Sequence, residues 1–345
     1  LKDGGVFKML RSFAESGSAA ITPLEGVLVG TDGFLSGTTS NGGANTLGTV
    51  YRIRPDGSGY GVLRVFGQTP GDAALPVGGV IQGSDGLLYG TAAAGGAYGQ
   101  GALFRVAPDA GGYSVFYSFR GTPSDGAMPS TKLIEGNDGF LYGTTSYGGV
   151  DRHGTVFRIR KDGGGYNVLR FFTGAPNDPS NPNGDLLQIS EGIIYGVTYA
   201  GGSEDLGTVF RLNPDGSGYS VVRSFTGQAQ TPANPWSGLL EGSDGRLYGT
   251  SLATGGNGGS VFSLAKDGSD LKILVALPKP VGGGTRPVGK LVEDSTGRLW
   301  GICWKRGPYE GGTVFSVAND GSGYQVVHEF AGAPSDGQAP ISSPN

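Results

Sequence analysis

One short phrase recurs at a nearly fixed spacing along the whole chain: an acidic residue (once Thr), then Gly, then two residues that are mostly apolar. Its six copies begin at Asp32, Asp85, Asp138, Glu191, Asp244 and Thr296, so four steps of 53 residues are followed by one of 52. Periods near 50 residues are typical of solenoids, propellers and repeat arrays. The period therefore predicts one architecture of like units, although 345 residues alone would suggest two unrelated domains.

Each unit contains four short strand candidates separated by turn signals. In the third copy we expect strands over residues 132–135, 140–144, 155–160 and 166–172. Apolar and charged residues alternate along the third of these, which is the two-residue period of a pleated strand, and no segment carries a long 3.6-residue stripe. The unit is therefore an all-β, four-stranded antiparallel meander.

The turns between the first two strands of each unit are predicted to be Asp-Gly hairpins of type I′. Such turns need a positive φ, which Gly adopts without a Cβ clash. We expect Gly86, Gly139 and Gly245 to have this conformation. The 69 Gly and 20 Pro are then explained as turn residues. The same content of Gly and Pro without a period would suggest disorder.

A meander of about 50 residues that is repeated six times fits a propeller blade. A β-sandwich needs no such regular unit, and a solenoid coil is usually shorter and builds parallel sheets. About ten residues join one unit to the next, which is enough to lead the chain from the outer strand of one blade to the inner strand of the next. The predicted fold is an all-β propeller of four-stranded antiparallel blades.

We expect a single propeller domain over residues 1–345. Its repeat units cover 14–66, 67–119, 120–172, 173–225, 226–277 and 278–330, with 1–13 as an isolated outer strand and 331–345 as the start of a further unit. The isolated strand, Asp3 to Phe13, copies the last strand of the other units. Either it belongs to a split seventh blade, or six blades close and it adds to an edge. Seven blades are slightly favoured.

Composition excludes several classes of protein. A net charge of −4 and a pI near 5.3 give no basic footprint for nucleic acid. The single cysteine, Cys303, excludes an internal disulfide framework and a multi-cysteine zinc site. No apolar run approaches the roughly 18 residues that span a bilayer, so no membrane span is expected. The chain opens without a secretory leader, and we expect any signal peptide to have been removed already.

The repeated phrase also resembles a known family. Residues 141–145 (Leu-Tyr-Gly-Thr-Thr), a Gly-Gly loop and residues 154–159 (Gly-Thr-Val-Phe-Arg-Ile) are similar to the GloVer tandem-repeat family. The resemblance covers nearly the whole chain. The fifth unit departs most in its loop, and the sixth departs in its strand and loop, with Trp300 in place of Tyr. The resemblance implies a bacterial, exported, surface-anchored propeller, hence a secreted or cell-surface location. It implies no catalytic residue.

Function is expected on one face of the ring. The loops between the second and third strands and the connections between units vary, whereas the turns on the opposite face repeat, and sites usually lie on loops of a rigid scaffold. Planar rings with a polar edge suit sugar stacking, and basic groups suit acidic parts of a polymer. The candidate ligand-binding residues are Tyr98, Tyr147, Tyr199, Trp236, Trp304, Lys305, Arg306, Tyr309 and Glu310.

A carbohydrate-active enzyme is the alternative interpretation, with a polysaccharide lyase or a glycosidase on the same face. His153 could act as a base near neutral pH, with Arg152 neutralising a uronate. Glu204 and Asp205 could belong to a glycosidase pair, which needs carboxylates about 5–9.5 Å apart. Solvated loop residues are the favoured explanation of all four, so they are catalytic candidates only if the protein is an enzyme.

The expected partner is a polysaccharide or a cell-surface glycan. No cofactor is expected, although the oxygen-rich segment 177–185 could hold calcium without the ligand spacing of an EF-hand. A third interpretation is a structural or interaction scaffold, in which the ring only presents its edges. The sequence does not decide among a binding module, an enzyme and a scaffold.

Overall fold

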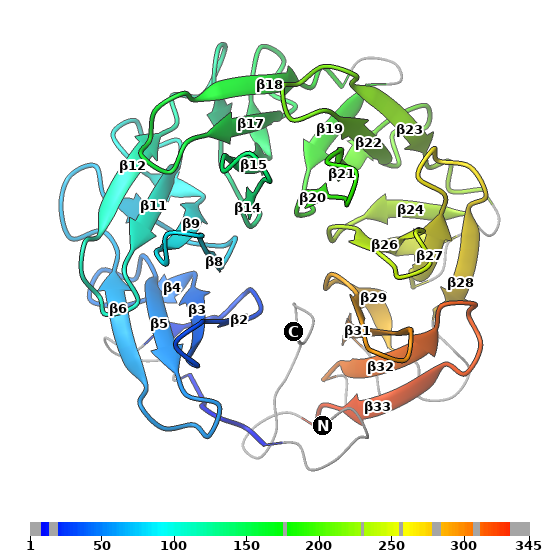
Figure 1. The fold of residues 1–345 in the computed structure, drawn as a ribbon, viewed down its shortest axis with the longest axis horizontal. Helices are drawn as coiled ribbons and strands as arrows, with labels where there is room; N and C mark the ends of the chain where they lie inside the picture. The colour runs from blue at the N-terminus through cyan, green and yellow to red at the C-terminus, as the bar shows by residue number, and fades with distance from the viewer. Residues whose placement is uncertain are drawn as a thin grey trace.

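The structure is a computed structural model that describes residues 8–13, 20–174, 178–228, 231–254, 258–277, 284–305 and 311–331. Every regular element in these ranges is a β-strand. Figure 1 shows the strands as six sheets around a central opening. The structure therefore confirms the all-β propeller predicted from the 53-residue period.

Each blade is an antiparallel meander in which the chain runs from an inner strand A to an outer strand D (Figure 1). In blades 1 to 3 the four strands are hydrogen-bonded in chain order. They are β2 (Leu28–Val29), β3 (Leu35–Thr39), β5 (Thr49–Ile53) and β6 (Gly61–Val65); β8 (Val80–Gln82), β9 (Leu88–Ala92), β11 (Ala102–Val106) and β12 (Ser114–Ser118); and β14 (Ile134–Glu135), β15 (Leu141–Thr145), β17 (Thr155–Ile159) and β18 (Asn167–Phe171).

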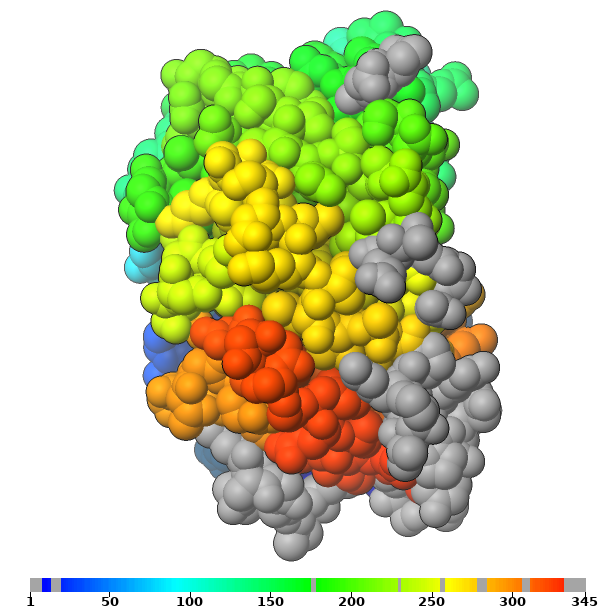
Figure 2. Space-filling model, turned by 90° about the vertical axis from the view of Figure 1, so that its right-hand side faces the viewer, coloured from blue at the N-terminus to red at the C-terminus, as the bar shows by residue number. Residues whose placement is uncertain are grey.

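In blades 4 to 6 strand B is longer, and two short segments pair with its two ends, one after the other along the same inner edge. The strands are β19 (Pro179–Pro182), β20 (Leu187–Gln188), β21 (Ile194–Gly201), β22 (Thr208–Leu212) and β23 (Ser220–Ser224); β24 (Pro232–Pro235), β25 (Leu240–Glu241), β26 (Leu247–Thr254), β27 (Ser260–Leu264) and β28 (Lys272–Ala276); and β29 (Thr285–Pro287), β30 (Val292–Glu293), β31 (Arg298–Lys305), β32 (Thr313–Ala318) and β33 (Gln325–Glu329). Figure 2 views the ring from its side, where β28 (yellow) and β33 (red) form the rim.

The D-to-A connections also pair with the end of strand B in the first three blades. There the two-residue ladders are separate from the blade sheets. They join β1 (Ala20–Ile21) to β4 (Asn41–Gly42), β7 (Ala73–Ala74) to β10 (Ala94–Gly95), and β13 (Gly126–Ala127) to β16 (Tyr147–Gly148). The connections are therefore fixed to the face on which the B-to-C loops lie, which we call the loop face.

The described residues contain six blades, and the slight preference for seven was wrong. Within the segment Asp3 to Phe13, residues 8–13 are not assigned to a strand, and the rest lies outside the described residues, as do most of 331–345. Residues 8–13 contact blade 1: the Phe13 ring centroid lies 5.1 Å from that of Tyr51, and Arg11 stacks on Tyr60 at 3.5 Å.

The hydrophobic core lies between adjacent blades. Each of five described clusters joins the strands of one blade to those of the next. A Phe that follows strand D packs edge-on against a Phe of strand C in the next blade, and this geometry favours aromatic pairs. Centroid distances are 4.8 Å for Phe66–Phe104, 5.3 Å for Phe119–Phe157, 5.3 Å for Phe172–Phe210 and 5.4 Å for Phe225–Phe262. One repeated aromatic joint thus holds four of the blade interfaces.

The A-to-B and C-to-D turns form the opposite face, which we call the turn face. Gly86, Gly139 and Gly245 have φ of 82°, 77° and 78°, as predicted. The type I′ assignment was wrong, because the preceding Asp residues are not at positive φ. The Gly139 N–H donates to the Gly136 carbonyl, which closes a four-residue turn, and the glycine then forms a bulge, as in three-residue hairpin loops.

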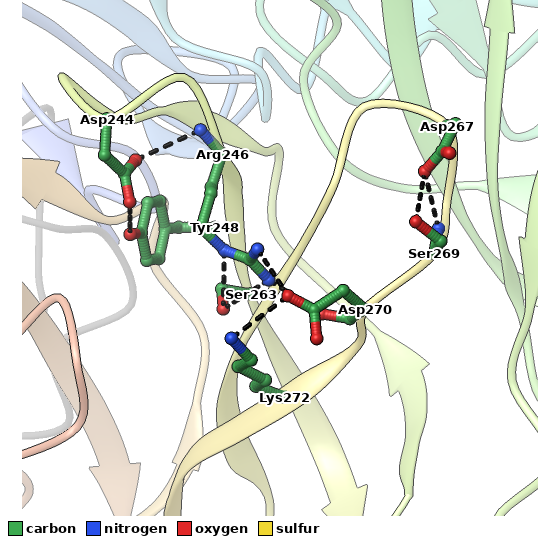
Figure 3. A network of polar contacts seen from close by, with 8 residues as sticks. All are labelled: Asp244, Arg246, Tyr248, Ser263, Asp267, Ser269, Asp270 and Lys272. Atoms are coloured by element: carbon green, nitrogen blue, oxygen red, sulfur yellow. Dashed lines mark hydrogen bonds and ion pairs between the residues drawn. The ribbon is translucent and has the colours of Figure 1, made fainter.

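In blades 2, 3 and 5 the Asp of the A-to-B turn accepts a hydrogen bond from the Tyr of the Leu-Tyr-Gly phrase. In blade 5, Asp244 accepts hydrogen bonds from the Arg246 N–H at 3.0 Å and from the Tyr248 hydroxyl at 2.7 Å (Figure 3). The same hydroxyl contact recurs at Tyr89 and Tyr142. The rings of these tyrosines are buried, so they are core residues, as expected from their recurrence.

Adjacent blades are also joined at the turn face. In blade 3 the Glu135 carboxylate accepts hydrogen bonds from the backbone N–H and the hydroxyl of Ser84 in blade 2, each at 2.7 Å, and the Lys161 ammonium lies 2.6 Å from it. Glu241 and Glu293 bind serines of the preceding blades in the same way. These repeated contacts leave the turn face uniform.

Candidate functional site

All three exposed aromatic side chains of the described residues lie on the loop face. Tyr98 is 52% exposed in the B-to-C loop of blade 2, Tyr147 is 49% exposed in β16, and Trp236 is 39% exposed directly after β24. The Arg120 guanidinium stacks on the Tyr98 ring at 5.3 Å. Every other aromatic ring in the described ranges is buried or half-buried.

Trp236 is held by a neighbouring aromatic residue. The half-buried Tyr199 ring meets it edge-on, with 5.8 Å between centroids and 87° between planes. The Asn234 side-chain amide donates to the Tyr199 carbonyl at 3.0 Å, which ties the two segments together. This pair therefore offers one indole face in a fixed orientation, and sequence reasoning had named both residues.

Three of the four catalytic candidates line one open depression between blades 3 and 4. His153, Glu204 and Asp205 surround a volume of about 630 Å³, together with Ser180. The His153 Nδ1 lies 2.8 Å from the Ser180 hydroxyl. The Asp205 carboxylate accepts the Gly201 N–H at 2.7 Å, so it closes its own loop. Glu204 is exposed.

The remaining candidates lie elsewhere. Arg152 is exposed beside His153, with φ of 64°. In blade 6 the half-buried Trp304 ring is contacted by the Lys305 ammonium at 5.2 Å and by the Arg286 guanidinium at 5.9 Å. Arg306, Tyr309 and Glu310 lie outside the described residues.

The central channel contains a second cavity that sequence reasoning missed. It encloses about 460 Å³ along the inner edges of the blades, and Trp236 stands on its lining. The charged side chains Glu25, Lys132, Asp185 and Lys290 also line it. The Lys132 ammonium lies 3.8 Å from the Glu25 carboxylate, and the Lys132 N–H donates to Asp185 at 2.8 Å.

Burial and neighbouring charges perturb the pKa of Glu25 and of Lys290. Burial, assisted by the charge of Asp185, raises the pKa of Glu25 to about 8, although Lys132 opposes the shift. Burial also lowers the pKa of Lys290; Asp185 opposes that shift and Lys132 adds to it. Titratable groups with strongly shifted pKa values are found most often at functional sites, so their presence in a cavity marks a candidate site.

One signal in the sequence could have found this cavity. Lys132, Asp185 and Lys290 occupy a single position of the repeat, just before strand A, and the other three blades have Gly there. At two of those glycines, Gly79 and Gly238, a Cβ would come within 2.8 Å of the Lys132 side chain and 2.6 Å of the Asp185 backbone. This position of the channel wall is therefore glycine in blades 1, 2 and 5 and charged in blades 3, 4 and 6.

The calcium prediction for segment 177–185 gains no support. Asp178 accepts hydrogen bonds from Arg170 and Thr173, Asp185 accepts one from Lys132, and Asn177 lies outside the described residues. Within the described ranges no group of three metal-ligating side chains gathers, and no helix is long and apolar enough to cross a membrane.

The model of the Gloeobacter/Verrucomicrobia repeat family matches residues 1–190 and 175–344, which together cover nearly the whole chain. This agrees with the resemblance of the repeated phrase. No curated protein matches the chain.

Several solved structures are similar in fold. An oligogalacturonate lyase in complex with manganese is 11% identical, with a TM-score of 0.58, over 91% of this chain and 82% of that one. A chain of a nidogen/laminin complex is 14% identical, with a TM-score of 0.51, over 86% and 93%. The extracellular domain of a candidate one-component system from B. thetaiotaomicron is 11% identical, with a TM-score of 0.62, and 96% of this chain covers only 36% of it. At these identities the likeness shows the fold alone.

Proposed function

The chain belongs to the Gloeobacter/Verrucomicrobia repeat family, and within that family we propose that it is an exported propeller that binds a polysaccharide or cell-surface glycan on its loop face. The location is proposed from the expected export of such proteins. The observation that carries the binding proposal is that the exposed aromatic side chains of the described residues, Tyr98, Tyr147 and Trp236, all lie on that face.

Exposed aromatic rings suit sugars, because the C–H faces of a pyranose stack on a flat ring while its hydroxyls stay hydrated. The three rings belong to blades 2, 3 and 5, so they spread across the face. An extended glycan chain could contact several of these rings at once, and several weak contacts together would give a higher overall affinity. Trp304 and Lys305 lie in blade 6, and their contact with a glycan remains a prediction.

Binding is tested with a glycan array, followed by titration of the best polymer against variants. Trp236→Ala should weaken binding by about 1–3 kcal/mol, the range for losing an aromatic contact. Val62→Ala is the matched control, because Val62 is 41% exposed on the outer strand β6. Equal affinity of wild type, Trp236→Ala and Tyr147→Ala for every bound glycan would contradict the proposal.

A second candidate is an enzyme that cuts the glycan at the depression of blades 3 and 4. The contact between His153 Nδ1 and Ser180 favours it, because an oriented imidazole can act as a general base. A polysaccharide depolymerisation screen separates the candidates. For an enzyme, His153→Ala should spare binding and lower turnover by about 100-fold or more. The absence of any cleavage, or cleavage unchanged in His153→Ala, would leave the binding module.

A further inference from the structure

The channel cavity contains a lysine without a direct ion-pair partner among the described residues. Lys290 stands before β30 and lines the cavity, and within the described residues its ammonium makes no hydrogen bond or ion pair. Lys132, the other cation, is 3.8 Å from Glu25, and both side chains are less than one-third exposed. An unpaired charge in a partly buried cavity is costly unless a partner arrives.

We propose that the channel cavity binds the carboxylate of an acidic sugar, held between the ammonium groups of Lys132 and Lys290. The anion site rests on the channel alone. That the ligand is a sugar rests on the proposed function, because the exposed indole of Trp236 borders the cavity and could stack on the ring.

The size of the cavity fits this ligand. About 460 Å³ lies in the range of small-molecule pockets, roughly 300–1,000 Å³. Glycine at the repeat position of blades 2 and 5 lets the Lys132 side chain and the Asp185 backbone approach closely, because a Cβ there would lie only 2.8 Å and 2.6 Å from them. The charged groups of the cavity come from blades 1, 3, 4 and 6.

The acidic groups of the cavity cancel only part of the charge of the two cations at neutral pH. The raised pKa of Glu25 keeps that carboxyl protonated, so it can donate a hydrogen bond to an anion. Asp185 accepts the backbone N–H of Lys132, and its negative charge offsets part of the positive charge near Lys290. Glu293 binds Ser243 and follows Lys290 by three residues, roughly 10 Å along a strand. An anion near Lys290 would also oppose the lowering of the pKa of Lys290.

Calorimetric titration of the full chain at pH 6.5 with D-glucuronate and its neutral isostere D-glucuronamide tests the site. Glucuronate should bind at least tenfold more tightly than glucuronamide. Its affinity should fall between pH 6.5 and 9, because Glu25 gains a negative charge as pH rises through about 8. Equal binding of the two sugars, or no glucuronate binding, would overturn the anion site.

Variants locate the contact. Lys290→Met should lower glucuronate affinity at least tenfold, whereas Lys290→Arg should stay within about threefold of wild type because it keeps the charge. Lys272→Met is the control, since Lys272 is 57% exposed on β28. Unchanged affinity in Lys290→Met would overturn the site, and thermal melts check that each variant is folded.

The two proposals fail separately. If a neutral glycan binds and Tyr147→Ala weakens it while glucuronate does not bind, the loop-face function stands and the channel site falls. If glucuronate binds tenfold more tightly than glucuronamide and no polymer binds, the channel site stands and the loop-face function falls.

Discussion

On the turn face the same contacts recur from blade to blade, whereas on the loop face the recurrence ends after blade 4. Three A-to-B turns use one Asp–Tyr hydrogen bond, and three blade boundaries use one Glu–Ser contact. The loop face has a repeated contact of its own at the D-to-A connections, where Asp72, Asp125 and Asp178 each accept a hydrogen bond from a Tyr hydroxyl. Blade 5 has Thr231 at this position.

The two kinds of contact differ in burial. Turn-face carboxylates are half-buried or exposed, while the side chain of Asp72 is 1% exposed and lies 2.6 Å from the Arg64 guanidinium. A buried charge is costly to leave unpaired, whereas a solvent-exposed charge is not. The comparison teaches that the connection at Asp72 depends on a more deeply buried ion pair than the contacts of the turn face, so breaking it should cost more.

The largest effect is expected at the buried connections. Asp72→Ala should destabilise the protein by about 3–5 kcal/mol, because it leaves Arg64 and the Tyr113 hydroxyl without their carboxylate. Urea unfolding measures the change. Thr231→Ala at the same position of blade 5 is the control and should cost less than about 1 kcal/mol. Similar losses in the two variants would mean that the connections do not differ.

A turn-face glycine should have a smaller effect. Gly139→Ala should cost about 1 kcal/mol, because the backbone stays at φ of 77° although the space around the new Cβ is open. Gly61→Ala is matched to it, since Gly61 also has open space but not a positive φ. Thermal melts of both should separate them; equal stability would contradict the backbone explanation.

The effect expected in the channel depends on pH and is close to zero at acidic pH. The pKa of Glu25 is raised from 4.5 to about 8, so the folded state favours the neutral carboxyl. Its contribution to stability is complete below about pH 4.5 and is lost as pH rises through 8. Glu25→Gln stays neutral, so it should melt near wild type at pH 5 and above it at pH 9. A difference that does not change with pH would contradict the shift.

The sequence predicted the parts of the molecule that repeat. The spacing of the Asp-Gly turns identified the blades, and the recurrence of Tyr142 and its equivalents identified the core. The type I′ assignment failed because the dipeptide does not show whether Asp138 itself has positive φ, which the bulged pairing decides. The prediction of the number of blades failed because closure of the ring depends on the packing angle between blades, and no local pattern encodes that angle.

The candidate site was predicted in part for a similar reason. Unequal loops drew attention to His153 and Trp236, because they stand out against a repeating background. Lys132, Asp185 and Lys290 stand out equally, but they are separated by about one or two periods, and each looks like an ordinary charged residue before a strand. Only the ring shows that these positions converge on one axis.

The aromatic joint between blades has a consequence for how such a protein can change over generations. The Phe66–Phe104 contact and its three equivalents use the same two ring positions on each side. A duplicated or exchanged blade would therefore meet a matching surface at both of its borders. Recombination could thus shuffle entire blades together with their loops, and new combinations of binding groups would arise without a new interior having to evolve.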